Sequence, residues 1–152
     1  MLYDIVTNKA LVIPACAWVV AQLIKTLVPF AQGKGLNLHH LLSSGGMPSA
    51  HSALVTALAT SVAMIEGCSS VAFGVTAVLA LIVMYDAAGV RQSVSQQAAT
   101  LNRIMEELRL RRPITELGSD LRELVGHTPF QVAVGAVLGI TIAWLWMTIA
   151  AM

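Results

Sequence analysis

Two histidines, His51 and His127, lie beside the starts of predicted helices, where side-chain and backbone groups can act together. His51 follows a flexible glycine pair, residues 45–46, and Pro48, a residue suited to a first helical turn. His127 is followed by Thr-Pro-Phe-Gln, in which the threonine can cap a helix and Gln131 can be its reciprocal partner. Free backbone amides at both helix starts can bind an anion.

These groups suit phosphoryl transfer. One histidine can attack phosphorus as a nucleophile while the other protonates the leaving alkoxide. Cationic side chains and helix-end amides can stabilise the charge that develops. This chemistry requires neither a metal nor another cofactor, and we expect none.

A metal site is an alternative for the histidines. Its ligands would be His39, His40, His51 and His127. No pair of them has the i, i+4 helical spacing common in such sites, and no cysteine joins them. His39 and His40 are better explained as polar loop residues at the membrane interface.

The composition predicts the elements that must position these groups. The 152 residues are 57% hydrophobic and 11% charged, with a mean hydropathy of +0.76, whereas soluble domains are roughly 25% charged. Because a helix needs about 20 mostly apolar residues to span a bilayer, we expect an all-α integral membrane helix bundle of about four transmembrane helices, forming one domain over residues 1–152. The predicted spans cover about residues 10–30, 48–65, 69–88 and 128–150, and a polar helical segment, about 91–125, can lie at the interface between the third and fourth.

The order of the spans brings ionisable residues to one side of the membrane. The loop after the first span and the segment after the third must share a side, called here the loop face. Spans two and four start from it with His51 and His127, while Lys25 and Asp86 reach it at the ends of spans one and three. All but one of the nine lysines and arginines fall on this side, and the exception is Lys9. We therefore expect a multi-pass protein of the cell membrane whose loop face is cytoplasmic.

Two short motifs resemble those of a known superfamily. Residues 48–51, Pro-Ser-Ala-His, resemble the Pro-Ser-Gly-His motif of the type 2 phosphatidic acid phosphatase and vanadium haloperoxidase superfamily. Residues 126–132, Gly-His-Thr-Pro-Phe-Gln-Val, resemble its Gly-x-His-x-x-x-Asp-Val element. A divergent bacterial branch of small membrane proteins is matched more closely, over about residues 22–140. That match is carried by residues 22–25, 44–52, 86–91 and 97–102.

The resemblance implies a role for each candidate site residue. It makes His127 the nucleophile that forms a phosphohistidine, His51 the general acid and Lys25 a phosphate ligand. Ser49 and neighbouring amides, including that of Gly46, would complete the phosphate pocket. The expected function is a metal-independent membrane phosphatase that hydrolyses a phosphomonoester of a lipid, for which phosphatidylglycerophosphate would be a sensible substrate. With a net charge of only +1, nucleic acid is not indicated as a partner.

Two basic positions depart from the superfamily pattern. An Arg-Pro pair is expected some way after the lysine, but this chain has only Pro29 there, so we expect Arg91 to supply the guanidinium. The expected Ser-Arg pair is reduced to Arg122, five residues before His127 where six is common. Both arginines are therefore candidate phosphate ligands.

A further departure concerns the carboxylate that usually orients the nucleophilic histidine. Gln131 occupies its position and can orient the ring but carries no charge. Without that charge the histidine should be a weaker base unless another carboxylate substitutes, and Asp86 is the candidate that the topology brings to the same face. A capping role for Gln131 is equally reasonable.

These departures keep a second function open. A noncatalytic membrane subunit or carrier could use the same residues to bind a phosphate-bearing ligand without cleaving it, and Gln131 and the missing Arg-Pro pair favour this alternative. The superfamily core also uses more spans than this chain has. The four helices must then complete a bundle alone or by self-association, and we favour a homodimer.

Overall fold

The computed structural model describes residues 2–31, 46–111 and 126–150, and all regular secondary structure within them is helical. The elements are α1 (Leu2–Thr7), α2 (Lys9–Ala31), α4 (Ala50–Glu66), α5 (Val71–Tyr85), the π-helix η1 (Asp86–Val90), α6 (Arg91–Arg111) and α7 (Pro129–Ile149). The prediction of an all-α membrane bundle is confirmed.

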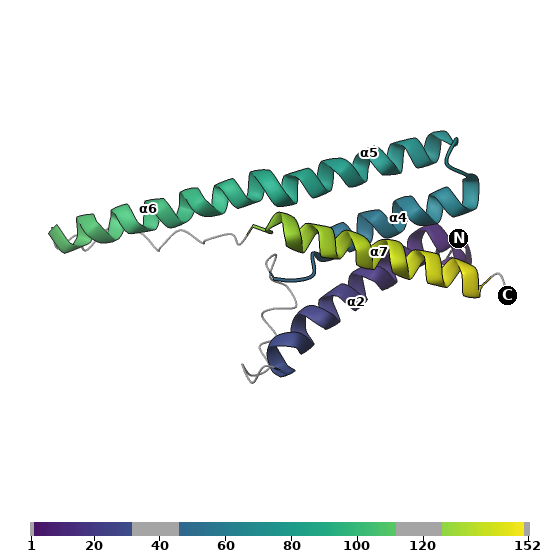
Figure 1. Cartoon of the computed structure of the whole chain (residues 1–152), viewed down its shortest axis with the longest axis horizontal. Coiled ribbons are helices and arrows are strands. Elements are labelled where there is room, and N and C mark those ends of the chain that lie inside the picture. Colours follow the sequence, from purple (N-terminus) through teal and green to yellow (C-terminus); the bar gives the residue numbers. More distant parts are fainter. Residues whose placement is uncertain (1, 32–45, 112–125, 151–152) are drawn as a thin grey trace.

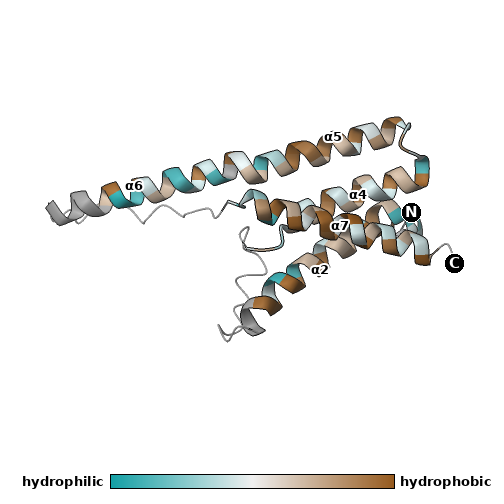
Figure 2. Ribbon diagram, viewed as in Figure 1, coloured by the Kyte–Doolittle hydropathy of each residue, from teal (hydrophilic) through white to brown (hydrophobic). Residues whose placement is uncertain are grey.

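Three stretches of these helices are long and apolar enough to cross a membrane, and one helix is shorter. The long stretches are Lys9–Val28, Val71–Met105 and Pro129–Ile149. The shorter apolar helix is α4, whose 17 residues extend over about 25 Å at a rise of 1.5 Å per residue. Figure 2 shows apolar residues along all four helices of the bundle. The chain is therefore a multi-pass membrane protein.

The polar segment expected after the third span begins as α6. It continues α5 through η1 as one long helix and extends past the other helices (Figure 1). Residues 112–125, which complete the predicted polar segment, lie outside the described residues.

The central helix of the bundle is α4, which packs against α2, α5 and α7. It runs parallel to α7, and both helices begin at the same end of the bundle (Figure 1). The core consists mostly of small side chains, in two clusters: Ile13, Ala17, Ala57 and Ala143, and Ala21, Ala50 and Ala53. Small residues allow helices to approach closely inside a membrane.

Two glycines make the contact between α4 and α7 unusually close. A Cβ atom at Gly135 would overlap the backbone carbonyl of Ser49. A Cβ atom at Gly139 would overlap the carbonyl of Ala53 and the hydroxyl of Thr56. Any larger residue at these two positions would push the helices apart.

Several hydroxyl side chains of α4 and its N-cap lie inside the bundle, where a membrane helix should place them. Ser49, Ser52, Thr56 and Ser61 are all buried. The Ser52 hydroxyl donates to the Ser49 hydroxyl at 3.0 Å, and the Thr56 hydroxyl lies 3.1 Å from the carbonyl of Ala136 on α7. The bond from Thr56 to Ala136 adds a polar contact between α4 and α7 beside their close glycine packing.

We expect Gly139→Ala to lower the free energy of unfolding by about 1 to 3 kcal/mol, the usual cost of overpacking. The matched control is Gly74→Ala on α5, where an added Cβ meets no atom within 4 Å. That control should be neutral or stabilising by up to about 1 kcal/mol because alanine favours helix. Unfolding of both variants in detergent, followed by circular dichroism, checks the difference, and equal stabilities would contradict the close packing.

Candidate functional site

The site is built where the N-termini of α4 and α7 meet. Ser49 caps α4, and its hydroxyl accepts from the Ser52 amide at 3.4 Å. The Ser49 amide itself donates to the carbonyl of Gln131, in the first turn of α7, at 3.2 Å. This hydrogen bond joins the two helix starts, so His51 and His127 belong to the same end of the bundle.

His127 lies directly before the cap of α7 and is 3% exposed. Its backbone amide donates to the carbonyl of Ala87 in η1 at 3.3 Å. Its ring atom Nδ1 lies 3.2 Å from Oε1 of Gln131. His127 is therefore held at two points: its backbone amide bonds to the π-helix, and its ring contacts a side chain of α7.

Gln131 caps the helix and orients the histidine at once. The predicted capping box is confirmed: the Thr128 hydroxyl accepts from the Gln131 amide at 3.3 Å, and Gln131 Oε1 accepts from the Thr128 amide at 3.1 Å. Because the Thr128 amide can only donate, the side-chain atom of Gln131 that faces it must be the oxygen. That oxygen can only accept, so the proton of the His127 bond lies on Nδ1. The lone pair of the neutral ring is then on Nε2.

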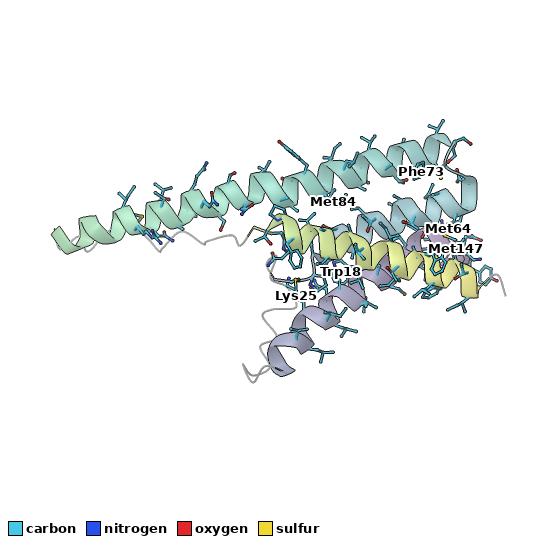
Figure 3. The ribbon with its side chains drawn as sticks, viewed as in Figure 1. Trp18, Lys25, Met64, Phe73, Met84 and Met147 are labelled. Carbon is cyan, nitrogen blue, oxygen red and sulfur yellow. The ribbon has the colours of Figure 1, made fainter. Side chains whose placement is uncertain are left out.

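Lys25 is buried in the bundle, at 5% exposure. Gly46 has a φ of +94°, and a Cβ placed there would lie 3.0 Å from Cε of Lys25. Glycine thus provides both the backbone conformation and the space for the lysine. Figure 3 labels Lys25 on α2, beside the chain that leads into α4. Two predicted phosphate ligands, Lys25 and Gly46, are in contact here.

The remaining predicted residues differ in their surroundings. His51 lies in the first turn of α4 and is exposed. Asp86 is half-buried and opens η1, one residue before the carbonyl that binds the His127 amide. Short π-helices are frequent at functional sites, and this one brings the Asp86 backbone to the His127 end of α7. Arg122 and the side chain of Arg91 lie outside the described residues.

The metal alternative depends on residues that the structure does not describe. His39 and His40 fall within residues 32–45, outside the described ranges. In the parts of the chain that are described, no three His, Cys, Asp or Glu side chains come together as metal ligands.

Sequence reasoning missed two features of the site. The first is the glycine pair at 135 and 139, although its G-x-x-x-G spacing is a known signal of close packing in membranes. The second is the Ala87 carbonyl that binds the His127 amide. No side-chain pattern marks a backbone acceptor of this kind, so only the structure could reveal it.

The fold and the site define a multi-pass, all-α membrane protein with a polar cluster at one end of its bundle. The model of the divergent PAP2 family matches residues 6–142. The chain is also 36% identical over 146 residues to the uncharacterized membrane protein YuiD of Bacillus subtilis (strain 168), and this match covers 90% of the chain and 92% of that protein. No solved structure matches the chain. The chain therefore belongs to the divergent PAP2 family, which confirms the resemblance in its motifs.

We expect nitrogen-15 NMR of the neutral His127 ring to show the Nδ1–H tautomer, with the lone pair on Nε2. Gln131→Leu removes the acceptor, and the ring should shift towards the Nε2–H form that histidine prefers in water. Gln131→Glu is the matched control, because it keeps an acceptor oxygen and should preserve the wild-type tautomer. An unchanged tautomer in Gln131→Leu would show that another group orients the ring.

Proposed function

We propose that this protein is a metal-independent phosphatase that hydrolyses a phosphomonoester of a lipid at the cytoplasmic face of the cell membrane. The observation that carries the proposal is the buried imidazole of His127, held through Nδ1 by Gln131 at 3.2 Å. This bond places the lone pair of the neutral ring on Nε2, the atom that must attack phosphorus. Membership of a PAP2-related family supports the same chemistry.

In the first step, Nε2 of His127 forms a bond to phosphorus as the bond from phosphorus to the ester oxygen breaks. His51, in its protonated form, gives its proton to the departing alkoxide. The products are the free lipid alcohol and a phosphohistidine on His127. The exposure of His51 is compatible with proton exchange between its ring and water.

In the second step, water attacks the phosphohistidine and passes a proton to the neutral ring of His51. The phosphorus–nitrogen bond breaks and inorganic phosphate leaves. His127 regains its Nε2 lone pair and His51 regains its proton, so the site returns to its starting state. The Lys25 ammonium and the amides near Gly46 stabilise the negative charge on the phosphoryl oxygens.

Asp86 supports His127 in this proposal. The contact between the His127 amide and the Ala87 carbonyl, at 3.3 Å, brings the start of η1 to the nucleophile. A carboxylate at that place favours the cationic ring that forms with the phosphohistidine. The homodimer expected from the missing spans stays a prediction.

One observation favours the second candidate function, a membrane subunit or carrier that binds a phosphate-bearing ligand without cleaving it. The group that contacts Nδ1 of His127 is an amide rather than a carboxylate. An amide stabilises imidazolium less, which is acceptable for binding and unfavourable for nucleophilic attack. A measurement of phosphate release from lipid phosphomonoesters decides between the two functions.

We expect purified protein in detergent to release phosphate from a panel of lipid phosphomonoesters that includes phosphatidylglycerophosphate. His127→Ala should abolish release, and vanadate should inhibit it. EDTA and the double variant His39→Ala, His40→Ala should have no effect, and loss of activity in either would favour the metal site. Phosphate release that does not depend on His127 would contradict the proposal, and no release across the panel would favour the carrier.

The role of His51 has its own signature in the same assay. His51→Ala should slow hydrolysis of a lipid alkyl phosphate by about 10²- to 10⁴-fold, the usual contribution of a general acid. The loss should be much smaller for p-nitrophenyl phosphate, because nitrophenolate leaves without needing a proton. Equal losses on both substrates would assign His51 to binding or packing instead.

Sidedness can be tested with cysteines on the two membrane faces. Cys68 is exposed in the turn between α4 and α5, opposite the loop face. It should react with an impermeant maleimide added to intact cells. Lys34→Cys in a Cys68→Ser background should resist the reagent until the cells are opened, because residue 34 follows the first span on the cytoplasmic side. The reverse pattern would place the site outside.

A further inference from the structure

A cavity of about 320 Å³ lies beneath the loop that leads into α4. Ile24, Lys25 and Val28 of α2 form one side, and Val134 and Leu138 of α7 form the other, with loop residues 46–48 between them. This volume is at the lower end of the range of about 300 to 1,000 Å³ that is typical of ligand sites. The cavity is separate from the hydrogen bonds that hold His127.

The cavity shares Lys25 and Gly46 with the candidate site, and its lining on α7 lies further along that helix than Gln131. Gln131, Val134 and Leu138 are spaced i, i+3 and i+7, so they share one face of α7. At a rise of 1.5 Å per residue, Val134 and Leu138 lie about 4.5 and 10.5 Å beyond Gln131 along the helix axis. A ligand that entered the cavity from the site would therefore extend along α7 for about two turns.

The residues that line the cavity indicate which kind of ligand it could bind. Apart from Lys25 and the backbone of the loop, the lining side chains are hydrocarbon or thioether groups. Among the described residues, the only charged one in the lining is Lys25, which is almost fully buried and packs against Gly46. A buried cation next to an apolar space inside membrane-spanning helices is complementary to a molecule with an anionic head and a hydrocarbon chain.

We propose that this cavity binds the alkyl chain of the substrate while Lys25 contacts its phosphate. The inference rests on the proposed function and narrows the substrate class. The substrate is a phosphomonoester whose phosphate lies within a few bonds of an alkyl chain. A phosphate carried on an extended headgroup, as in phosphatidylglycerophosphate, would leave the cavity empty and should be hydrolysed less efficiently.

Binding can be tested without turnover. A long-chain alkyl phosphate with a diazirine near the phosphate end of its chain should crosslink to residues 24–28 and 134–138, in both wild type and His127→Ala. The corresponding alcohol should label these residues at least fivefold less, and unlabelled alkyl phosphate should compete. Equal labelling by phosphate and alcohol would mean that bulk membrane lipid fills the cavity, and labelling only at other residues would place the chain elsewhere. Either result overturns the inference.

Catalysis provides the second test, through a substitution that fills the cavity. Val134→Trp should lower kcat/KM for dodecyl phosphate by about tenfold or more, the scale of discrimination that a hydrophobic pocket provides. Its activity on methyl phosphate, whose single carbon is too short to enter the cavity, should fall much less. The matched control is Val137→Trp, on the exposed side of α7, which should affect neither substrate. Equal losses of Val134→Trp on both substrates would contradict the inference.

The outcomes separate the two proposals. If the wild type crosslinks at the cavity but hydrolyses no phosphate, the phosphatase proposal fails and the cavity still binds the ligand. If it hydrolyses phosphate with no preference for long chains and no crosslink at the cavity, only the cavity proposal fails. Should Val134→Trp not fold, Val134→Ala replaces it and should lose at least twofold on dodecyl phosphate alone.

Discussion

The close packing of α4 against α7 is the constraint on which the rest of the site depends. Gly135 and Gly139 leave room for the backbone of α4, at Ser49 and Ala53. Only at this separation can the Ser49 amide reach the carbonyl of Gln131. Helices held apart by side chains at these positions would carry their N-termini to different places. Two small residues, two turns and more along the chain from His127, therefore position the candidate site.

The membrane makes this arrangement both costly and stable. A polar group without a partner costs several kcal/mol in hydrocarbon, so pairing between polar groups at a bundle end is strongly favoured. The backbone amides of Ser49, His127 and Thr128 each have an acceptor in a neighbouring element or at a helix cap. Movement of α7 would break the hydrogen bonds of both the Ser49 and the His127 amides, and movement of η1 would break that of His127. The site is consequently stabilised as a unit rather than residue by residue.

Much of the fold could be predicted because each span carries its own signal. Long apolar stretches mark α2, α5 and α7, and the residues Thr128, Pro129 and Gln131 mark a helix start by their types alone. The order of spans was enough to bring Lys25, His51 and His127 to one end. These inferences need only local chemistry and the alternation of direction across a bilayer.

What could not be predicted involves contacts between elements. The approach of Lys25 to Gly46 depends on how α2 crosses the loop. The hydrogen bond from His127 to Ala87 depends on a π-helix, which amino-acid composition does not predict. The continuation of α5 into α6 was also missed, since a polar, amphipathic stripe is compatible with a surface helix or with an extension of the span. Only packing distinguishes these two cases.

The amide at Gln131 has an electrostatic consequence that reaches beyond the orientation of His127. A carboxylate at position 131 would stabilise the imidazolium form of His127, and the N-terminus of α7 would favour the negative charge of that carboxylate. A carboxylate would also stand beside the phosphate of the proposed substrate, where two like unit charges about 4 Å apart repel by about 4 kcal/mol at an effective dielectric constant near 20. In the described part of the site, Lys25 is the only lysine or arginine side chain that is buried, so little positive charge is available to offset this repulsion. An uncharged acceptor keeps the ring oriented and the helix capped while leaving the attraction of Lys25 for an anion undiminished.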